Sequence, residues 1–108
     1  MRPHASALIA LAAIILDGSS PAWAAGDAVA GKALAERSCA SCHLVAPDQK
    51  SATTEAPPFT ELASRSPDEI EALATFLAAP HPPMPPVSLT RREIDDVVAY
   101  IASLKEVK

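Results

Sequence analysis

Three segments of the chain repeat apolar residues every three or four positions, the spacing of one face of an α-helix. They predict helices over residues 27–38, 66–79 and 90–105, and a short helical turn is expected at 60–64. No segment alternates apolar and polar residues as a half-buried strand would. The pattern therefore predicts an all-α fold of three to four helices.

Two of these helices begin with a capping box, in which the N-cap side chain and the third helical residue bind each other's backbone N–H groups. One pairs Ser66 with Glu69, and the other pairs Thr90 with Glu93. The expected apolar faces of the three helices are formed by Val29, Leu34 and Ala35; by Ile70, Leu73, Ala74 and Leu77; and by Ile94, Val97, Val98, Ile101 and Leu104.

The segments between the helices are irregular and carry different signals. Residues 49–55 are polar and unpatterned, so a solvated loop is expected there. Residues 80–86 read PHPPMPP, and five prolines in seven residues exclude the interior of a helix or a sheet. We expect a rigid, extended strap that carries Met84.

The first 24 residues have the order of a secretory signal peptide. A basic start at residues 1–2 is followed by an apolar run over residues 5–16 and then by small residues before position 25. An uncleaved anchor is the alternative, but the run is shorter than the roughly 17 apolar residues that a spanning helix needs. We predict cleavage after Ala24, export to the periplasm, no stable membrane insertion afterwards and a single domain over residues 25–108.

The net charge and the size of the chain limit the possible functions and the possible kinds of core. The chain has 9 basic and 13 acidic residues and a net charge of −4, a balance that argues against nucleic-acid binding. A domain of this size has a marginal core and usually gains a disulfide, a metal or another staple. Beyond the predicted signal peptide, the aromatic residues are only Phe59, Phe76 and Tyr100. We therefore expect something other than side chains to fill part of the interior.

The sequence CASCH at residues 39–43 contains both cysteines of the chain. A thioredoxin-like dithiol would need a preceding strand, whereas a helix is predicted there. A structural zinc site needs four ligands, and His81 is the one further strong candidate outside the signal peptide. A local disulfide is compatible with export but would leave His43 unexplained.

Cys-x-x-Cys-His is also the attachment motif of c-type haem. Cys39 and Cys42 would bond to the two vinyl groups as thioethers, and His43 would bind the iron. This interpretation explains all three residues, agrees with export and supplies the staple that a small core lacks. It predicts one covalent haem c per chain.

The second axial ligand separates a carrier from a catalyst, because a thioether opposite histidine saturates the iron, whereas an open position permits ligand chemistry. Met84 is the only methionine outside the predicted signal peptide and is the candidate. Met84 could instead fill the core, and His81 could be the ligand. A metal-bound histidine generally donates its other ring N–H. For His43, we expect the carbonyl of Pro57 or Pro58 to accept it.

The stretches GDAVAGKALAERSCASCH and MPPVSLTRREIDDVVAYIASLK resemble two parts of the class I c-type cytochromes, the small bacterial monohaem kind. These parts are the N-terminal helix with its attachment site, and the methionine loop with the C-terminal helix. The resemblance covers nearly all of residues 25–108. It implies the cytochrome c fold, in which helices surround the haem, with a close helix crossing at Gly31, Val97 and Tyr100. Ala35 stands where the family often has an aromatic residue, so we expect this crossing to be filled less tightly.

The resemblance also implies a function as a one-electron carrier and not as an enzyme. Its partners would be redox proteins: a bc-type complex, an oxidase, or a periplasmic dehydrogenase or reductase. The chain would act as a monomer or as a subunit of a larger redox complex, and a haem sensor or enzyme with a displaceable sixth ligand is the remaining alternative. The expected haem pocket includes Pro57, Pro58, Phe59 and Tyr100. Candidate partners for the haem propionates are Arg65, Arg91 and Arg92, although all three could equally be solvated surface charges, which is the expected role of most such residues.

Overall fold

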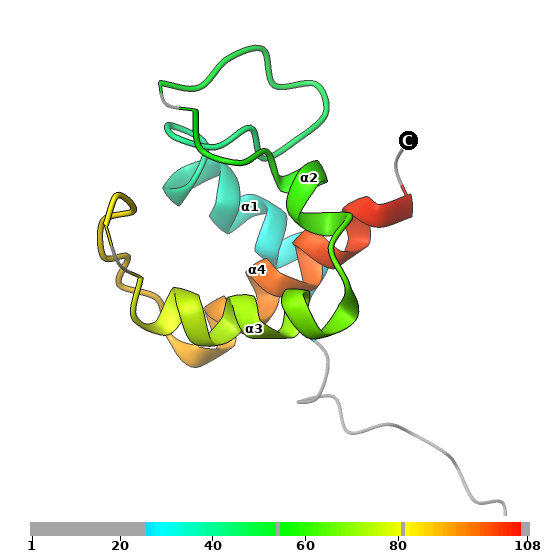
Figure 1. The fold of residues 1–108 in the computed structure, drawn as a ribbon, viewed down its shortest axis with the longest axis vertical. Coiled ribbons are helices and arrows are strands. Elements are labelled where there is room, and N and C mark those ends of the chain that lie inside the picture. The colour runs from blue at the N-terminus through cyan, green and yellow to red at the C-terminus, as the bar shows by residue number, and fades with distance from the viewer. Residues whose placement is uncertain (1–25, 54, 81, 107–108) are drawn as a thin grey trace, which may run out of the picture.

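The structure is a computed structural model that describes residues 26–53, 55–80 and 82–106 (Figure 1). Within these residues the elements are the α-helices α1 (Ala28–Ser38), α2 (Phe59–Ala63), α3 (Pro67–Ala78) and α4 (Arg91–Ser103), and the 3₁₀ turn η1 (Leu104–Glu106). The described part of the chain contains no strand, so the predicted all-α fold is confirmed. The predicted signal peptide with its cleavage site after Ala24, and His81, lie outside the described residues.

Local hydrogen bonds explain where the helices begin. The Asp27 carboxylate caps α1 by accepting from the N–H groups two and three residues further on, at 2.9 and 3.2 Å. Both predicted capping boxes are confirmed. In them, Glu69 accepts from the N–H of Ser66 at 2.9 Å, and Glu93 accepts from the N–H of Thr90 at 2.7 Å. The starts of α3 and α4 are therefore fixed by side chains a few residues apart in sequence.

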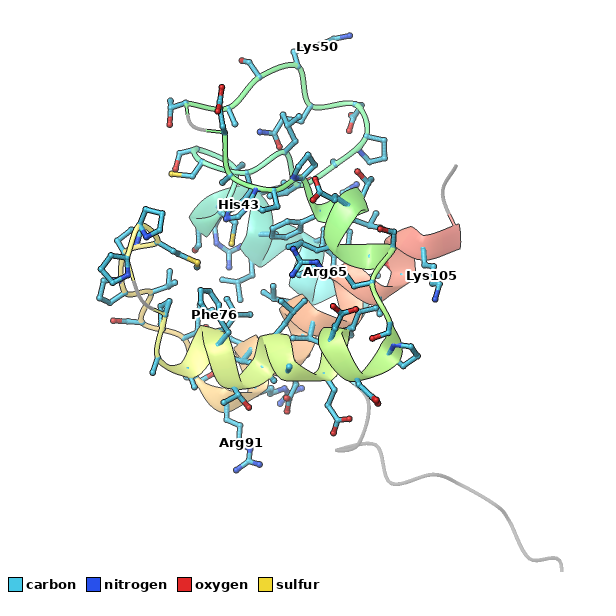
Figure 2. All side chains as sticks on the ribbon, in the orientation of Figure 1. His43, Lys50, Arg65, Phe76, Arg91 and Lys105 are labelled. Carbon is cyan, nitrogen blue, oxygen red and sulfur yellow. The ribbon has the colours of Figure 1, made fainter. Side chains whose placement is uncertain are left out.

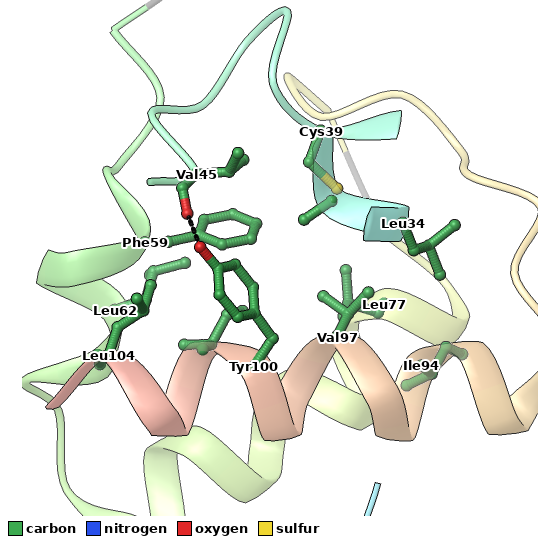
Figure 3. Packing of buried hydrophobic residues seen from close by; sticks show 13 residues of the cluster. Leu34, Cys39, Val45, Phe59, Leu62, Leu77, Ile94, Val97, Tyr100 and Leu104 are labelled. Atoms are coloured by element: carbon green, nitrogen blue, oxygen red, sulfur yellow. Dashed lines mark hydrogen bonds between the residues drawn. The ribbon is translucent and has the colours of Figure 1, made fainter. Parts of the chain in front are cut away.

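Helix α4 is the centre of the packing, because it contacts α1, α2, α3 and η1. Its buried face belongs to one apolar cluster, which Figure 3 shows from close by. The expected apolar face of α1 was wrong at one position: Val29 is 81% exposed, while Leu34 and Ala35 are buried. The most buried members of the cluster are Ala35, Val45, Phe59, Ala63, Val97 and Ile101.

The crossing of α1 and α4 leaves no room for a side chain at Gly31. A Cβ atom at Gly31 would collide with the backbone carbonyl of Asp96 and would lie 2.9 Å from the Cβ of Tyr100. The start of α1 is also tied to α4, since the N–H of Asp27 donates to the Asp96 carboxylate at 2.8 Å. Ala35, the position at which a less tightly filled crossing was expected, is fully buried. The predicted close approach at Gly31 is confirmed.

Two connecting segments complete the fold. The irregular loop between α1 and α2 extends to one end of the molecule, and the proline-rich part of the connection from α3 to α4 lies at one side (Figure 1). The latter segment turns at residues 82–83, so the expectation of an extended strap was wrong there. Among the described residues, every helix is too short or too polar to cross a bilayer.

Candidate cofactor-binding site

A cavity of about 790 Å³ lies between the CASCH segment, α3 and the proline-rich segment. A volume of this size is typical of a pocket that encloses a large ligand. The residues that line it are mostly apolar, and they come from α2, α3, α4 and the connecting segments. Its apolar walls on the side of α3 and α4 are Ala72, Leu73, Phe76, Leu77, Val97 and Ile101.

The cavity brings together side chains that are far apart in sequence. Cys39, Cys42 and His43 line it together with Met84, which follows His43 by 41 residues. Of the expected pocket residues, Pro57 and Phe59 also line it. Pro58 and Tyr100 are absent from the lining: Pro58 is the N-cap of α2, and Tyr100 lies in the packed cluster on α4.

The CASCH segment forms a tight turn directly after α1. The N–H of Cys39 still bonds to the carbonyl of Ala35 at 2.8 Å, as in a continuing helix. The N–H groups of Cys42 and His43 then both donate to the Cys39 carbonyl, at 3.2 and 2.9 Å. No disulfide joins Cys39 to Cys42. Burial, and after it the proximity of Cys42, raises the pKa of the Cys39 thiol.

The imidazole of His43 is held from two directions. Its Nδ1 lies 2.7 Å from the carbonyl oxygen of Pro57, so the predicted hydrogen bond is made, and Pro57 is the acceptor. A carbonyl oxygen can only accept, so Nδ1 carries the proton and Nε2 of the neutral ring keeps its lone pair. The ring centroid of Phe59 lies 5.4 Å away at an interplanar angle of 55°. His43 therefore presents the nitrogen that a metal would need.

A second aromatic contact connects this site to α4. The ring centroid of Tyr100 lies 6.3 Å from that of Phe59. The Tyr100 hydroxyl donates to the carbonyl of Val45 at 2.6 Å (Figure 3). Burial raises the pKa of Tyr100, and the negative charges of Glu36 and Asp48 add to the effect. Tyr100 thus anchors the segment that follows His43 to the central helix.

The family of the chain follows from comparison with known proteins. The family model described as Cytochrome c matches residues 28–105. The chain belongs to the cytochrome c family. It is 46% identical over 97 residues to "Cytochrome c-552" of Bradyrhizobium diazoefficiens, a match that covers 90% of this chain and 92% of the relative. No solved structure matches.

The residues of this class I c-type cytochrome fit the covalent haem c that the family binds. Two thiols, a thioether and an imidazole whose Nδ1 is bound to Pro57 all line one mostly apolar cavity. Thiol, imidazole and thioether are also the side chains that c-type haem uses. In the described part of the chain, no three His, Cys, Asp or Glu side chains are grouped to hold a metal by themselves. The zinc interpretation thus finds no ligand set among these residues.

The three arginines considered for the propionates lie in different places. Arg65 lines the haem cavity and is half-buried, whereas Arg91 lines a second, separate cavity between α3 and α4. Figure 2 shows Arg65 near the middle of the molecule and Arg91 pointing outward below α3. Arg92 lines neither cavity. Among the described lining residues, Arg65 is the one lysine or arginine, so it is the remaining candidate of the three.

Sequence patterns did not identify Phe76, which lines the cavity, or Gln49, which binds the backbone of the CASCH segment. Phe76 lines the cavity from α3 and lies next to the predicted apolar stripe, directly before Leu77 (Figure 2). An aromatic residue beside such a stripe was the signal that could have found it. The expectation of a solvated loop over residues 49–55 was wrong for Gln49, which is half-buried and makes several hydrogen bonds. No periodic pattern marks Gln49.

Proposed function

We propose that residues 25–108 form a periplasmic one-electron carrier whose haem c is bound by Cys39 and Cys42 and ligated by His43 and Met84. The observation that carries this proposal is the convergence of these four side chains on one apolar cavity. The family supports a haem-containing electron carrier in general, and the ligand set, the location and the mature boundary are our additions.

Each side chain has a distinct task in this proposal. Cys39 and Cys42 would hold the haem through thioether bonds, and the tight turn between them keeps both sulfurs at the same cavity. His43 would give Nε2 to the iron, because its Nδ1–H is already bound to Pro57. Met84 would supply the thioether on the other axial position. When bound, the haem supplies reversible one-electron chemistry at iron.

The same arrangement of side chains favours electron transfer over catalysis at the iron. If His43 and Met84 take both axial positions, no position remains for a substrate or a gas. The walls of the cavity are mostly apolar, so few polar side chains there would have to rearrange when the charge of the haem changes. The prolines on both sides of Met84 have no N–H group and restrict the backbone, which keeps the thioether in place. These features support a carrier.

The first residues of the chain support the proposed location, and the family supports the proposed kind of partner. The order of charged, apolar and small residues over 1–24 supports export and cleavage. Partners would be redox proteins such as a bc-type complex, an oxidase, or a periplasmic dehydrogenase or reductase. Purification from native periplasm distinguishes a free carrier from a subunit of a complex. Co-purification of one tightly bound partner would favour a subunit.

Carbon monoxide tests the carrier function directly. The reduced protein should not bind it promptly, because Met84 would occupy the position that carbon monoxide needs. Met84→Ala should bind carbon monoxide readily. Leu89 lies in the same connection between α3 and α4 as Met84 but lines the second cavity, so Leu89→Ala should behave like the unmodified protein. Prompt and tight binding by the unmodified protein would contradict the proposal.

A further inference from the structure

One side chain in the loop after CASCH contacts the backbone on both sides of His43. The Oε1 atom of Gln49 accepts from the N–H of Val45 at 2.9 Å. Its Nε2 atom donates to the carbonyls of Ala40 at 2.9 Å and His43 at 3.0 Å. Nε2 also lies 3.1 Å from the carbonyl of Ser51. One carboxamide thereby joins the CASCH turn to the loop that follows it.

The partners of Gln49 fix the orientation of its amide. A backbone N–H can only donate and backbone carbonyls can only accept, so the oxygen must face Val45 and the nitrogen must face the three carbonyls. An amide nitrogen has two N–H groups, so two of the three carbonyls share one of them. No other natural side chain of this length offers an acceptor and two donors on one planar group.

The segment held by Gln49 is the one from which the His43 ring projects. The carbonyl of Leu44 accepts from the N–H of Phe59 at 2.9 Å, and the carbonyl of Val45 accepts from the Tyr100 hydroxyl at 2.6 Å. Gln49 completes this set, because it binds the His43 carbonyl and the Val45 N–H. The backbone after the imidazole is thus fixed at consecutive peptide groups.

We propose that Gln49 is a positioning residue for His43: its carboxamide holds the backbone of the CASCH turn and of Val45, and so sets the orientation of the imidazole in the cavity. Pro57 fixes the rotation of the ring through Nδ1, whereas Gln49 fixes the backbone from which the ring extends. This inference rests on the proposed function, in which His43 is an axial ligand of the haem iron.

Proton NMR of the ferric holoprotein tests the proposal, because the hyperfine shifts of the haem methyl groups follow the orientation of the axial ligands. Gln49→Met has a similar length without the hydrogen bonds. Gln49→Glu keeps an acceptor for the Val45 N–H and removes both donors. Lys50→Ala changes the next, exposed residue and is the matched control. Amide hydrogen exchange at Val45 reports on the acceptor side separately.

We expect Gln49→Met to change the methyl shift pattern and to speed exchange at Val45 by roughly tenfold, as for the loss of one hydrogen bond. Gln49→Glu should also change the methyl pattern but keep the protection at Val45. Lys50→Ala should change neither. If Gln49→Met yields no holoprotein, Gln49→Glu alone decides through the same methyl pattern.

The possible failures are distinguishable. If the unmodified ferric protein lacks histidine ligation, the proposed function fails. If histidine ligation is present but the Gln49 variants keep the methyl pattern, this inference fails alone. The inference also fails if a Gln49 variant lowers the unfolding temperature but leaves the methyl pattern unchanged. Gln49 would then stabilise the loop without positioning His43.

Discussion

At the scale of single residues, the site depends on polar side chains that bind backbone carbonyls. The His43 bond to Pro57 could be predicted, because a ligating histidine needs an acceptor and a stiff proline segment follows at a suitable distance. Gln49 could not, because a polar residue in an unpatterned loop gives the same local signal whether it is solvated or half-buried. Whether such a residue is buried depends on contacts across the loop, and these contacts leave no repeating pattern in the sequence.

The Tyr100 hydroxyl should make stability depend on alkaline pH. Its pKa is raised in the folded protein, so its contribution is fully present below the ordinary tyrosine value of about 10 and is lost as the pH rises through the folded value. Tyr100→Phe should cost about 1 kcal/mol at neutral pH, the contribution of one hydrogen bond, and should flatten this alkaline loss. Urea unfolding of both proteins at several pH values measures the free energy of unfolding and its alkaline loss. An equal alkaline loss in both proteins would contradict the assignment.

Arg65 should raise the reduction potential if it faces the haem propionates. A cation near the haem disfavours the ferric state, so Arg65→Gln should lower the potential by roughly tens of millivolts. Arg91→Gln removes the same charge at the other cavity and should change the potential much less. Redox titration of the two variants side by side gives the comparison. Equal shifts would show a general charge effect and would remove Arg65 as a specific partner.

At the scale of elements, the helices were predictable because caps and apolar spacing are local signals. Both capping boxes and the close approach at Gly31 are present in the structure. The face of α1 was misjudged at Val29, since a short helix with few apolar residues defines its buried side poorly. The turn at residues 82–83 was also missed, because proline content excludes a helix without specifying the path of the chain.

Gly31→Ala should be strongly destabilising although alanine is the better helix former. The added Cβ would meet the Asp96 carbonyl, which belongs to the backbone of α4 and cannot rotate away. We expect a loss of about 2–3 kcal/mol, against a gain of at most about 1 kcal/mol from helix propensity. Val29→Ala, an exposed change in the same helix, should stay within about 0.5 kcal/mol. Denaturant unfolding of both variants checks this, and a stabilised Gly31→Ala would contradict the observed crossing.

At the scale of the whole molecule, the haem cavity is the least predictable feature from helix patterns alone. Apolar spacing predicts which face of a helix is buried but not that Phe76, Met84 and the CASCH turn surround one shared space. The CASCH motif supplied the missing information, because it predicted a haem, and a haem of that size requires a cavity. The thin set of aromatic residues was a second indication that side chains alone leave the interior incomplete.

The haem should therefore be part of the stability of the domain. The double variant Cys39→Ala with Cys42→Ala cannot attach it covalently, and a cavity of about 790 Å³ would remain in a small core. We expect this protein, once freed of haem, to lose its cooperative thermal transition and its near-ultraviolet circular dichroism. The covalently loaded protein should keep both. Equal transition temperatures would show that the side chains form a sufficient core without the haem.

The most direct test of the account is the optical spectrum of the ferric and ferrous protein, recorded with Met84→Ala alongside. Ligation by His43 and Met84 predicts a sulfur–iron charge-transfer band in the ferric protein that is lost in Met84→Ala. A spectrum that is the same in both proteins would contradict it, because Met84 would then not be a ligand of the iron that CASCH is proposed to hold.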